Sequence, residues 1–389
     1  MTQPRLHPIY AGMPVTIFEE MSGLSRQTGA INLGQGFPDG APPPALLEAL
    51  ARASMERSHQ YPPMAGIPEL RRAVAAFYAR TQALDLPPES VIVTSGATEA
   101  VASAILAVVQ PGDEVLLFSP AYDAYAPLVR RAGGVPVFIA LQPPLWRYDH
   151  AAIEAAISPR TRALVLNDPL NPTGTVASPS DLAMLAQLCV THDLFAICDE
   201  VWENVRFDGQ PHVSLLAQPG MKTRALKIGS AGKIFGATGW KVGWIVAAPE
   251  VAAVVGRAHQ FLTFTTPPNL QVAVAYGLGK EDAWFEGMRR DLQRARDRLA
   301  DGLGALGFPV LPSAGTYFLS IDLAALDPKL DDEAFCLDLV RRHGVAAIPV
   351  SAFYAQDAVR SVVRFCFAKT DATLDAALER LAGALGKVA

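Results

Sequence analysis

The sequence predicts an α/β fold built on a largely parallel sheet, because short apolar runs alternate with helical segments between about residues 91 and 247. The runs are apolar throughout, which is typical of strands buried on both faces of a sheet. Polar residues gather directly after the runs, and ligands bind at that edge of such sheets. After about residue 275 a long charged helix is followed by separate strands and helices, which indicates a smaller α+β domain.

Length and composition narrow the class of protein. The chain has 389 residues, of which 50% are hydrophobic and 18% charged, and its formal net charge is −5. This length favours one large and one small domain. We expect residues 1–40 to form an N-terminal arm with part of the small domain, residues 41–275 the large domain, and residues 276–389 the small C-terminal domain.

The same composition disfavours several partners. Mild acidity without basic runs argues against nucleic-acid binding. The longest apolar run, residues 100–109, is too short to cross a bilayer, so we expect no membrane partner. The four cysteines are scattered and are typical of buried residues in a reducing compartment, so we expect a cytoplasmic protein.

Glycine and proline are frequent in residues 1–40, which are therefore expected to be irregular apart from a short strand that begins near Ile31. Helices should follow at about residues 44–55 and 68–80. Pro68 suits the first position of a helix because it has no N–H to leave unpaired, and Glu69 adds a favourable charge in the first turn.

The alternating region should contain the strands of the sheet. They are the apolar runs at residues 91–94, 115–118, 135–139, 163–166, 194–198, 226–229 and 244–247. Residues 95–99 open a helix that Pro111 and Gly112 close. Residues 178–181 resemble a capping box with proline at the first helical position, which predicts another helix.

The last part begins with a helix at residues 284–306 that is rich in arginine and aspartate. It should be followed by strands and helices at about residues 315–319, 332–343, 345–349 and 362–367, and by a C-terminal helix. Arg364 lies in an apolar strand, where an unpaired guanidinium is costly. We therefore expect an anionic partner for Arg364, which could be an internal carboxylate or that of a substrate.

Several polar residues stand at predicted carboxyl ends of strands, so one site could collect them. They are residues 95–98, Tyr122, Asn171, Asp199 and Lys233. Lys233 follows a turn of small residues, where nothing bulky blocks the approach of a flat ligand. Its amine can form a Schiff base with an aldehyde if burial or a neighbouring cation lowers its pKa.

The neighbours of Lys233 suit a phosphorylated pyridine aldehyde. The amides after Gly96 open a helix, and a helix N-terminus attracts phosphate. Ser230 and Lys241 add a hydroxyl group and a positive charge.

The ring of such a ligand also finds candidate partners. Asp199 could face the ring nitrogen and stabilise its protonated form, Asn171 could donate to the phenolic oxygen, and Tyr122 could stack on the ring. Each residue also fits an ordinary role, since Asp199 could cap a helix, residues 171–174 have the composition of a turn, and Tyr122 could be a core residue. The seven histidines show no metal-binding spacing, so no metal site is expected.

Five motifs occur in order along the chain. They are N-P-T-G at residues 171–174, D-E-V at 199–201, S-A-G-K at 230–233, G-W-K-V-G-W at 239–244 and R-F at 364–365. In this combination the sequence resembles the class I and II aminotransferases of pyridoxal-phosphate fold type I, from Gly34 to the C-terminus. The resemblance implies a large domain with a mostly parallel seven-stranded sheet, a smaller α+β domain, and pyridoxal 5′-phosphate as cofactor.

The resemblance also implies roles for the matching residues. Lys233 would form the Schiff base with the cofactor and move protons, Asp199 would pair with the pyridine nitrogen, and Asn171 with the ring oxygen. The residues that would hold the phosphate or stack on the ring are Gly96, Ala97, Thr98, Ser230, Lys241 and Tyr122. Those that would bind the substrate are Gly36, Asn167 and Arg364, with Arg364 on the α-carboxylate.

The resemblance further implies a homodimer with shared active sites. Tyr61 would reach the phosphate in the partner subunit, and residues 259–266 would line the partner's site. Two positions depart from the family. Trp202 stands where the family usually has a tyrosine that donates to the ring oxygen, an atom that an indole N–H does not necessarily reach. Lys241 stands where many members have arginine, and this lysine is similar to the branch with kynurenine/glutamine, methionine and succinyl-diaminopimelate aminotransferases.

The sequence therefore predicts an aminotransferase that moves the α-amino group of an amino acid to a 2-oxo acid in two half-reactions. A succinyl-diaminopimelate aminotransferase of lysine biosynthesis and a cysteine-conjugate β-lyase are the alternatives. A non-catalytic cofactor-binding regulator is disfavoured, because no DNA-binding module fits in the short N-terminal arm. An aromatic or apolar substrate pocket could form from Tyr61, Phe18, His259, Phe261 and Phe353. No second arginine can be assigned to a distal carboxylate, which disfavours strict aspartate specificity.

Overall fold

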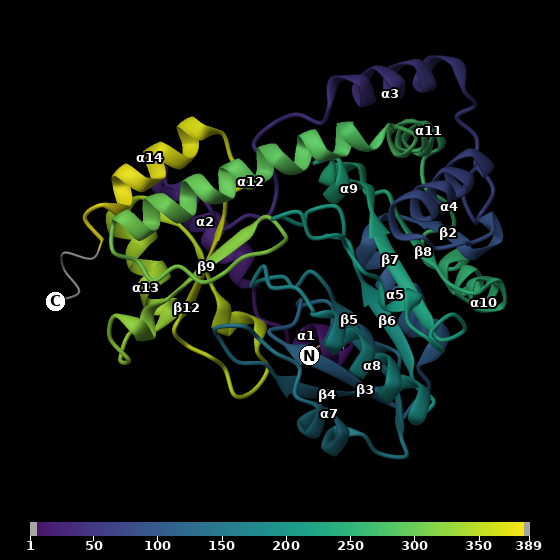
Figure 1. The fold of residues 1–389 in the computed structure, drawn as a ribbon, viewed down its shortest axis with the longest axis horizontal. Coiled ribbons are helices and arrows are strands. Elements are labelled where there is room, and N and C mark those ends of the chain that lie inside the picture. The colour runs from purple at the N-terminus through teal and green to yellow at the C-terminus, as the bar shows by residue number, and fades with distance from the viewer. Residues whose placement is uncertain (1–5, 385–389) are drawn as a thin grey trace, which may run out of the picture.

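A seven-stranded sheet forms the centre of the structure, a computed structural model that describes residues 6–384 (Figure 1). Its strands follow the order β2-β8-β7-β6-β5-β3-β4. Their bounds are β2 Val91–Thr94, β3 Glu114–Ser119, β4 Val135–Ala140, β5 Thr161–Asn167, β6 Phe195–Asp199, β7 Ala225–Ser230 and β8 Gly243–Val246. Neighbouring strands are parallel, except that β8 is antiparallel to β2 and β7. The predicted mostly parallel α/β sheet is confirmed.

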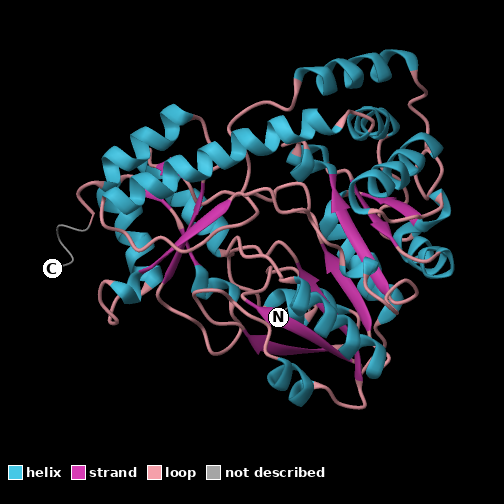
Figure 2. Ribbon diagram, viewed as in Figure 1, coloured by secondary structure: helices cyan, strands magenta, loops and turns pink. Residues whose placement is uncertain are grey.

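Both faces of this sheet are buried. Alternate residues of its strands belong to two separate apolar clusters. Leu117 and Val165 lie in one cluster, and Leu116 and Leu164 lie in the other. Helices lie on both sides of the strands (Figure 2). A sheet covered in this way leaves its strand ends as the place where polar groups can meet a ligand.

The helices predicted at residues 44–55 and 68–80, and those that open at residues 95–99 and 178–181, are present, and further helices lie around the same sheet. Their bounds are α3 Pro44–Glu56, α4 Pro68–Gln82, α5 Gly96–Val108, α6 Tyr125–Arg131, α7 His150–Ala156, α8 Pro179–Thr191, α9 Ala231–Ile234, α10 Pro249–Gln260 and α11 Pro268–Leu278. The capping box is present, since Ser178 accepts from the backbone N–H of Asp181 and Asp181 accepts from that of Ser178. The sequence patterns did not predict the short helices α7 and α9. They also did not predict α10, which packs against β2, or α11, which packs against α3 and α4.

A second, antiparallel sheet has the strand order β11-β12-β9. Its strands are β9 Phe318–Asp322, β11 Ile348–Pro349 and β12 Val362–Cys366, and the helices of this part are α12 Asp282–Ala305, α13 Asp332–Asp338 and α14 Asp371–Leu381. The long helix α12 reaches from the large sheet to this smaller one (Figure 1). The strand predicted at 315–319 begins later, because Thr316 adopts a left-handed backbone with φ of 68° and its N–H donates to Val205.

The prediction that residues 1–40 are irregular is wrong for much of that segment. Residues Pro8–Ala11 form α1 and Ile17–Thr28 form α2. The Thr16 side chain caps α2 by accepting from the N–H of Glu19, and Gly29 ends it with φ of 66°. Pro8, Gly12 and Gly29 mark helix ends. Strand β1 (Ile31–Asn32) then pairs in parallel with β10 (Val345–Ala346), which ties the N-terminal segment to the C-terminal part.

Two further properties concern membrane-spanning helices and the state of the cysteines. Within residues 6–384, no helix has the length and apolar character needed to cross a bilayer. The four cysteines are buried and carry no disulfide.

Candidate active site

One cavity collects most of the polar residues that follow the strands of the large sheet. It has a volume of about 230 Å³ and lies where β3, β5, β6 and β7 end. The predicted site residues that line it are Gly96, Ala97, Thr98, Tyr122, Asn167, Asn171, Asp199, Ser230, Lys233 and Lys241. The sheet topology therefore brings together residues that are far apart in the sequence.

Lys233 stands in the short helix α9, directly after β7. Its backbone carbonyl accepts a hydrogen bond from the Tyr317 hydroxyl at 2.7 Å, which fixes the turn. Its Nζ lies 4.6 Å from the centre of the Trp202 ring. Burial lowers the pKa of Lys233 to about 8, and the positive charge of Arg364 acts in the same direction. A neutral amine, which can act as nucleophile and base, is thus accessible near neutral pH.

Asp199 ends β6 and is nearly buried. Its Oδ2 accepts from the hydroxyl of Tyr125 at 2.5 Å, while its Oδ1 is buried with no hydrogen-bond partner among the described residues. Burial raises the pKa of Asp199, and the bond from Tyr125 and the charge of Lys233 oppose that rise. The carboxylate therefore has one oxygen held by the protein and one available to a ligand.

A site suited to an anion lies at the N-terminus of α5. Gly96 has φ of 77°, and a Cβ placed on it would lie 3.2 Å from the Nζ of Lys241. A Cβ on Gly243 would lie 2.7 Å from the carbonyl carbon of Gly96, so glycine at both positions lets β8 approach the start of the helix. Free N–H groups, the helix dipole and the lysine charge all favour an anion at this point.

Arg364 in β12 is 1% exposed. Its Nη1 donates to the Asn171 side-chain oxygen at 3.0 Å and its Nη2 to the Gly34 carbonyl at 2.6 Å. The guanidinium carbon lies 3.9 Å from the centre of the Phe318 ring. Within residues 6–384 it forms no ion pair with a carboxylate, and burial lowers its pKa to about 9. Of the two predicted partners, the internal carboxylate is therefore absent from this part of the chain.

Comparison with known proteins identifies the family. The model of class I and II aminotransferases matches residues 28–381. The probable N-succinyldiaminopimelate aminotransferase of Mycobacterium tuberculosis is 45% identical over 98% of each chain. The methionine aminotransferase of Escherichia coli is 43% identical over 94% of this chain and 95% of its own. The solved structure of N-succinyldiaminopimelate aminotransferase from M. tuberculosis has a TM-score of 0.94 at 44% identity and covers 98% of this chain and 100% of its own.

The chain belongs to the class I and II aminotransferase family. It is an aminotransferase of fold type I that depends on pyridoxal phosphate, as predicted from its motifs. The residues of this aminotransferase fit the cofactor on structural grounds. The buried, unpartnered Oδ1 of Asp199 suits a protonated ring nitrogen, and the start of α5 with Lys241 suits a phosphate.

Three of the predicted site residues do not line the cavity. Gly36 packs against Phe318, since a Cβ there would lie 2.5 Å from that ring, and Phe318 in turn contacts Arg364. Arg364 reaches the site through Asn171. Tyr61 is 82% exposed and touches Phe264 with ring centres 5.5 Å apart, so this subunit does not direct it into its own cavity.

Two other predicted residues have structural partners in the aminotransferase. Asn167 donates to the Asp199 carbonyl and accepts from the Asn171 N–H, each at 2.9 Å, which leaves one N–H for a ligand. His259 is fully buried and lies 2.9 Å from Glu99, which agrees with a structural role.

Tyr125, Tyr317 and the orientation of Trp202 were missed at the sequence level. Tyr125 lies three residues after Tyr122, and this closeness in the sequence is the only signal that could have pointed to it. Trp202 is 2% exposed and is held edge-on by Tyr317 with ring centres 4.8 Å apart. Its side chain lines the cavity, with the Lys233 Nζ 4.6 Å from the ring centre.

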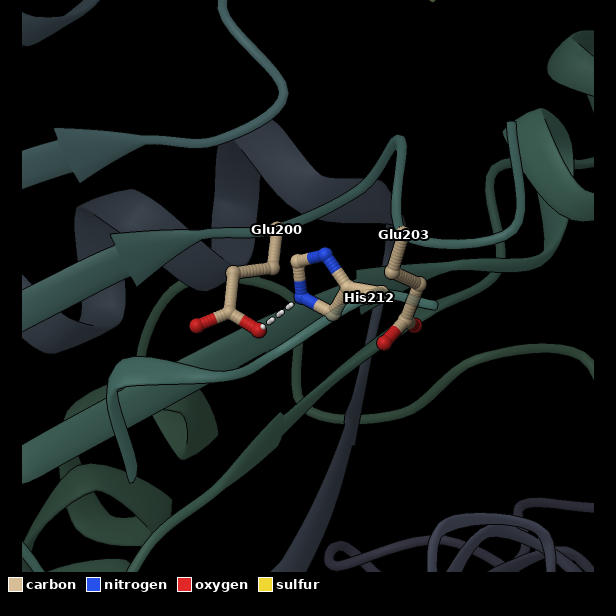
Figure 3. Close-up of side chains that lie close together, drawn as sticks. All are labelled: Glu200, Glu203 and His212. Carbon is tan, nitrogen blue, oxygen red and sulfur yellow. Dashed lines mark hydrogen bonds and ion pairs between the residues drawn. The ribbon is translucent and has the colours of Figure 1, made fainter. Parts of the chain in front are cut away.

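A buried ion cluster includes residues from the segment that carries Asp199 and Trp202. The side chains of Glu200, Glu203 and His212 offer ligand atoms within 4.8 Å of one another (Figure 3). The ammonium of Lys227, itself fully buried, pairs with Glu200 and with Glu203, the latter at 2.6 Å. Lys227 thus already supplies a cation between the two carboxylates, and the arrangement is an ion cluster that anchors residues 200 and 203.

Removing the cation from this cluster should be costly. We expect Lys227→Met to lower the free energy of unfolding by about 3–5 kcal/mol, because two buried carboxylates lose their cation. Urea unfolding followed by circular dichroism measures this change. The exposed Lys329 provides the control, and Lys329→Met should stay within about 0.5 kcal/mol of the wild type. Equal stabilities of the two variants would contradict the ion cluster.

Proposed function

We propose that this aminotransferase holds the α-carboxylate of an amino acid at Arg364 and moves the proton at Cα with Lys233. The observation that carries the proposal is the buried guanidinium of Arg364, which lacks a carboxylate partner among the described residues. A buried cation of this kind is stabilised when a carboxylate binds, because Arg and carboxylate groups form two parallel charge-assisted hydrogen bonds. The carboxylate would then direct Cα toward Lys233.

Specific residues would hold the cofactor. When bound, pyridoxal phosphate supplies an aldehyde that reacts with amines and a protonated ring that withdraws electrons from bonds at Cα. Lys233 would bind its aldehyde carbon and Asp199 its ring nitrogen. Asn171 would donate to the phenolic oxygen through its side-chain N–H, since its side-chain oxygen already accepts from Arg364. The residues proposed to hold the phosphate and flank the ring are Gly96, Ala97, Thr98, Ser230, Lys241 and Tyr122.

Lys233 has the properties of a proton carrier. Burial brings its pKa to about 8, so a substantial fraction of the amine is neutral near pH 7.5. General bases work best when their pKa lies near the working pH. We propose that the neutral amine takes the proton from Cα of the amino donor and delivers it to the former aldehyde carbon of the cofactor. It would carry a proton in the opposite direction when a 2-oxo acid accepts the amino group.

The wall around Arg364 supports substrates with apolar or aromatic side chains. The guanidinium lies 5.4 Å from the ring centres of both Phe18 and Phe353, and these two rings touch edge to face. Of the five residues predicted to form the side-chain pocket, these two contact Arg364 in this chain. We therefore propose methionine or aromatic amino acids as donors.

A second candidate substrate is favoured by an adjoining cavity. It has a volume of about 580 Å³, shares Phe18 and Phe353 with the wall of Arg364, and carries Arg360. A long side chain that ends in a carboxylate, such as that of succinyl-diaminopimelate, would fit this length and charge. Glu20 and Glu333 also line the cavity and would repel such a carboxylate, so the apolar donors are placed first.

The visible absorbance of the purified holoenzyme tests this proposal. The enzyme is mixed with methionine, glutamine, phenylalanine, kynurenine, aspartate or succinyl-diaminopimelate, and the band of the protein-bound cofactor is followed. We expect the apolar and aromatic donors to bleach the band at lower concentration than aspartate. Bleaching by succinyl-diaminopimelate alone would favour the second candidate. Release of pyruvate and ammonia from a cysteine conjugate would indicate β-lyase activity, and a band that no amino acid bleaches would overturn the proposal.

We further propose that the enzyme is a cytoplasmic homodimer. Within each chain we propose that the large domain begins at residue 41 and the small C-terminal domain at residue 276. An exposed apolar patch supports the dimer, because large patches of this kind usually mark interfaces. It consists of Tyr61, Phe261, Leu262 and Phe264, of which Tyr61 and Phe261 are 82% and 84% exposed. Tyr61 would then serve the phosphate in the partner subunit. The buried free cysteines support a reducing compartment.

Sedimentation velocity measures the proposed dimer. We expect the wild type to sediment with the mass of two chains and Phe261→Asp to shift toward one chain, because a buried charge would be left unpaired in the interface. Leu145→Asp is the control, since Leu145 is 44% exposed and lies outside the patch. A monomeric wild type, or a Phe261→Asp variant as dimeric as the control, would contradict this interface.

A further inference from the structure

Tyr125 forms the shortest contact made to Asp199 by a side chain. It is the first residue of α6 and is 3% exposed. Its hydroxyl lies 2.5 Å from Asp199 Oδ2, a distance typical of a charge-assisted O–H···O⁻ hydrogen bond. Its ring packs edge-on against Tyr122 with ring centres 5.7 Å apart, and its N–H donates to the Tyr122 carbonyl at 3.2 Å. The hydroxyl is therefore held in place by the ring and by the backbone.

The other groups around Asp199 do not replace this bond. The backbone N–H of Val201 and the positive charge of Lys233 also lower the pKa of Asp199, while the negative charge of Glu200 raises it. Asp199 Oδ1 has no partner among the described residues. Burial by itself would favour the protonated acid, which cannot pair with a protonated ring nitrogen. Tyr125 supplies the side-chain donor that favours the ionised form.

Tyr125 itself remains a donor at all pH values of interest. Burial and the neighbouring negative charge of Asp199 raise the pKa of the Tyr125 phenol well above its usual value. The proton therefore stays on the phenol oxygen and is shared with Asp199. A buried phenol that only donates holds the carboxylate in one orientation and spreads its negative charge.

We propose that Tyr125 is a positioning residue for Asp199, which holds Oδ2 and keeps the carboxylate ionised so that Oδ1 can pair with the protonated ring nitrogen of the cofactor. The inference rests on the proposed role of Asp199 and adds a residue that acts through it. Without the phenol, Asp199 becomes a stronger base, and the proton between ring nitrogen and carboxylate moves toward oxygen. When the ring nitrogen is less protonated, the ring withdraws electrons from the bonds at Cα less strongly, so turnover falls.

The test compares two Tyr→Phe variants of the holoenzyme. Tyr125→Phe keeps the ring and removes only the hydroxyl. Tyr78→Phe is the matched control, because Tyr78 is also buried and its hydroxyl donates to a buried carboxylate, that of Glu203, at 2.7 Å. Tyr78 does not line the cavity. Loading the enzymes with cofactor that carries ¹⁵N in its ring reports the protonation of that nitrogen directly by NMR.

We expect Tyr125→Phe to move the ¹⁵N signal toward that of an unprotonated pyridine and to lower kcat about tenfold or more, the effect of losing a hydrogen bond to a charged group. Tyr78→Phe should leave the ¹⁵N signal at its wild-type position. In an Asp199→Asn background, Tyr125→Phe should change kcat far less, because its effect passes through the carboxylate.

A wild-type ¹⁵N signal in Tyr125→Phe, with a loss of thermal stability similar to that of Tyr78→Phe, would overturn the inference and leave Tyr125 a packing residue. An equal effect of Tyr125→Phe with and without the Asp199 carboxylate would also overturn it. If instead the wild-type enzyme binds cofactor with an unprotonated ring nitrogen, the proposed role of Asp199 fails, and the inference fails with it for that separate reason.

Discussion

Lys233→Ala is expected to abolish turnover, with kcat about 10⁴-fold below that of the wild type. A positioned group that transfers a proton contributes up to about this factor, and burial lowers the pKa of Lys233 in the cavity wall to about 8, near the working range. Lys241, the other lysine of the cavity wall, sits at the start of α5, where it suits an anion. No other amine in the described cavity can take over proton transfer at Cα.

Stopped-flow absorbance with methionine or phenylalanine measures this loss directly. Lys329→Ala is the control, since Lys329 is exposed and lies outside the cavity. The Lys233→Ala variant should remain folded. The substitution removes a buried amine from the cavity wall but leaves intact the hydrogen bond from the Tyr317 hydroxyl to the backbone carbonyl of residue 233. Circular dichroism checks this point. Wild-type turnover in a folded Lys233→Ala enzyme would remove Lys233 from the mechanism.

Most of the large sheet could be predicted because its strands are buried on both faces. A continuous apolar run such as residues 163–166 has few alternatives to a central strand, and the structure places it in β5. The same rule located the site, since Asn171, Asp199 and Lys233 each follow a strand of a parallel sheet. The apolar runs that predict the strands therefore also predict where the site lies.

The parts that were not predicted depend on distant contacts. Helix α2 has a Thr16 cap and a Gly29 end, but the glycines and prolines on either side of it resemble a loop when the packing against the C-terminal part is unknown. Tyr125 and Asp199 are 74 residues apart, and no local pattern reports that their side chains meet. The partner of Arg364 was left open for the same reason, because only three-dimensional neighbours show that no carboxylate faces it within residues 6–384.

Arg364→Met is expected to lower kcat/KM for amino acid donors by about 10²–10³-fold. Truncating one partner of a buried, hydrogen-bonded charge pair costs about 2–5 kcal/mol, and the substrate α-carboxylate would lose both bonds from the guanidinium. Methionine fills a volume near that of the arginine stem and keeps the contact with Phe318, so the change removes mainly charge. Arg364→Lys should recover part of the loss, because lysine restores the charge without the paired geometry.

The decisive comparison uses a substrate pair that differs only in the carboxylate. Wild-type enzyme should bleach the cofactor band with methionine at far lower concentration than with 3-(methylthio)propylamine, its decarboxylated analogue. The Arg364→Met variant should discriminate little between methionine and the amine, because it lacks the guanidinium proposed to bind the carboxylate. The folded state should not suffer, since a buried guanidinium without a carboxylate partner is itself costly and burial already lowers its pKa to about 9. A variant that still prefers methionine strongly would show that another group reads the carboxylate, and the free N–H of Asn167 would then be the next candidate.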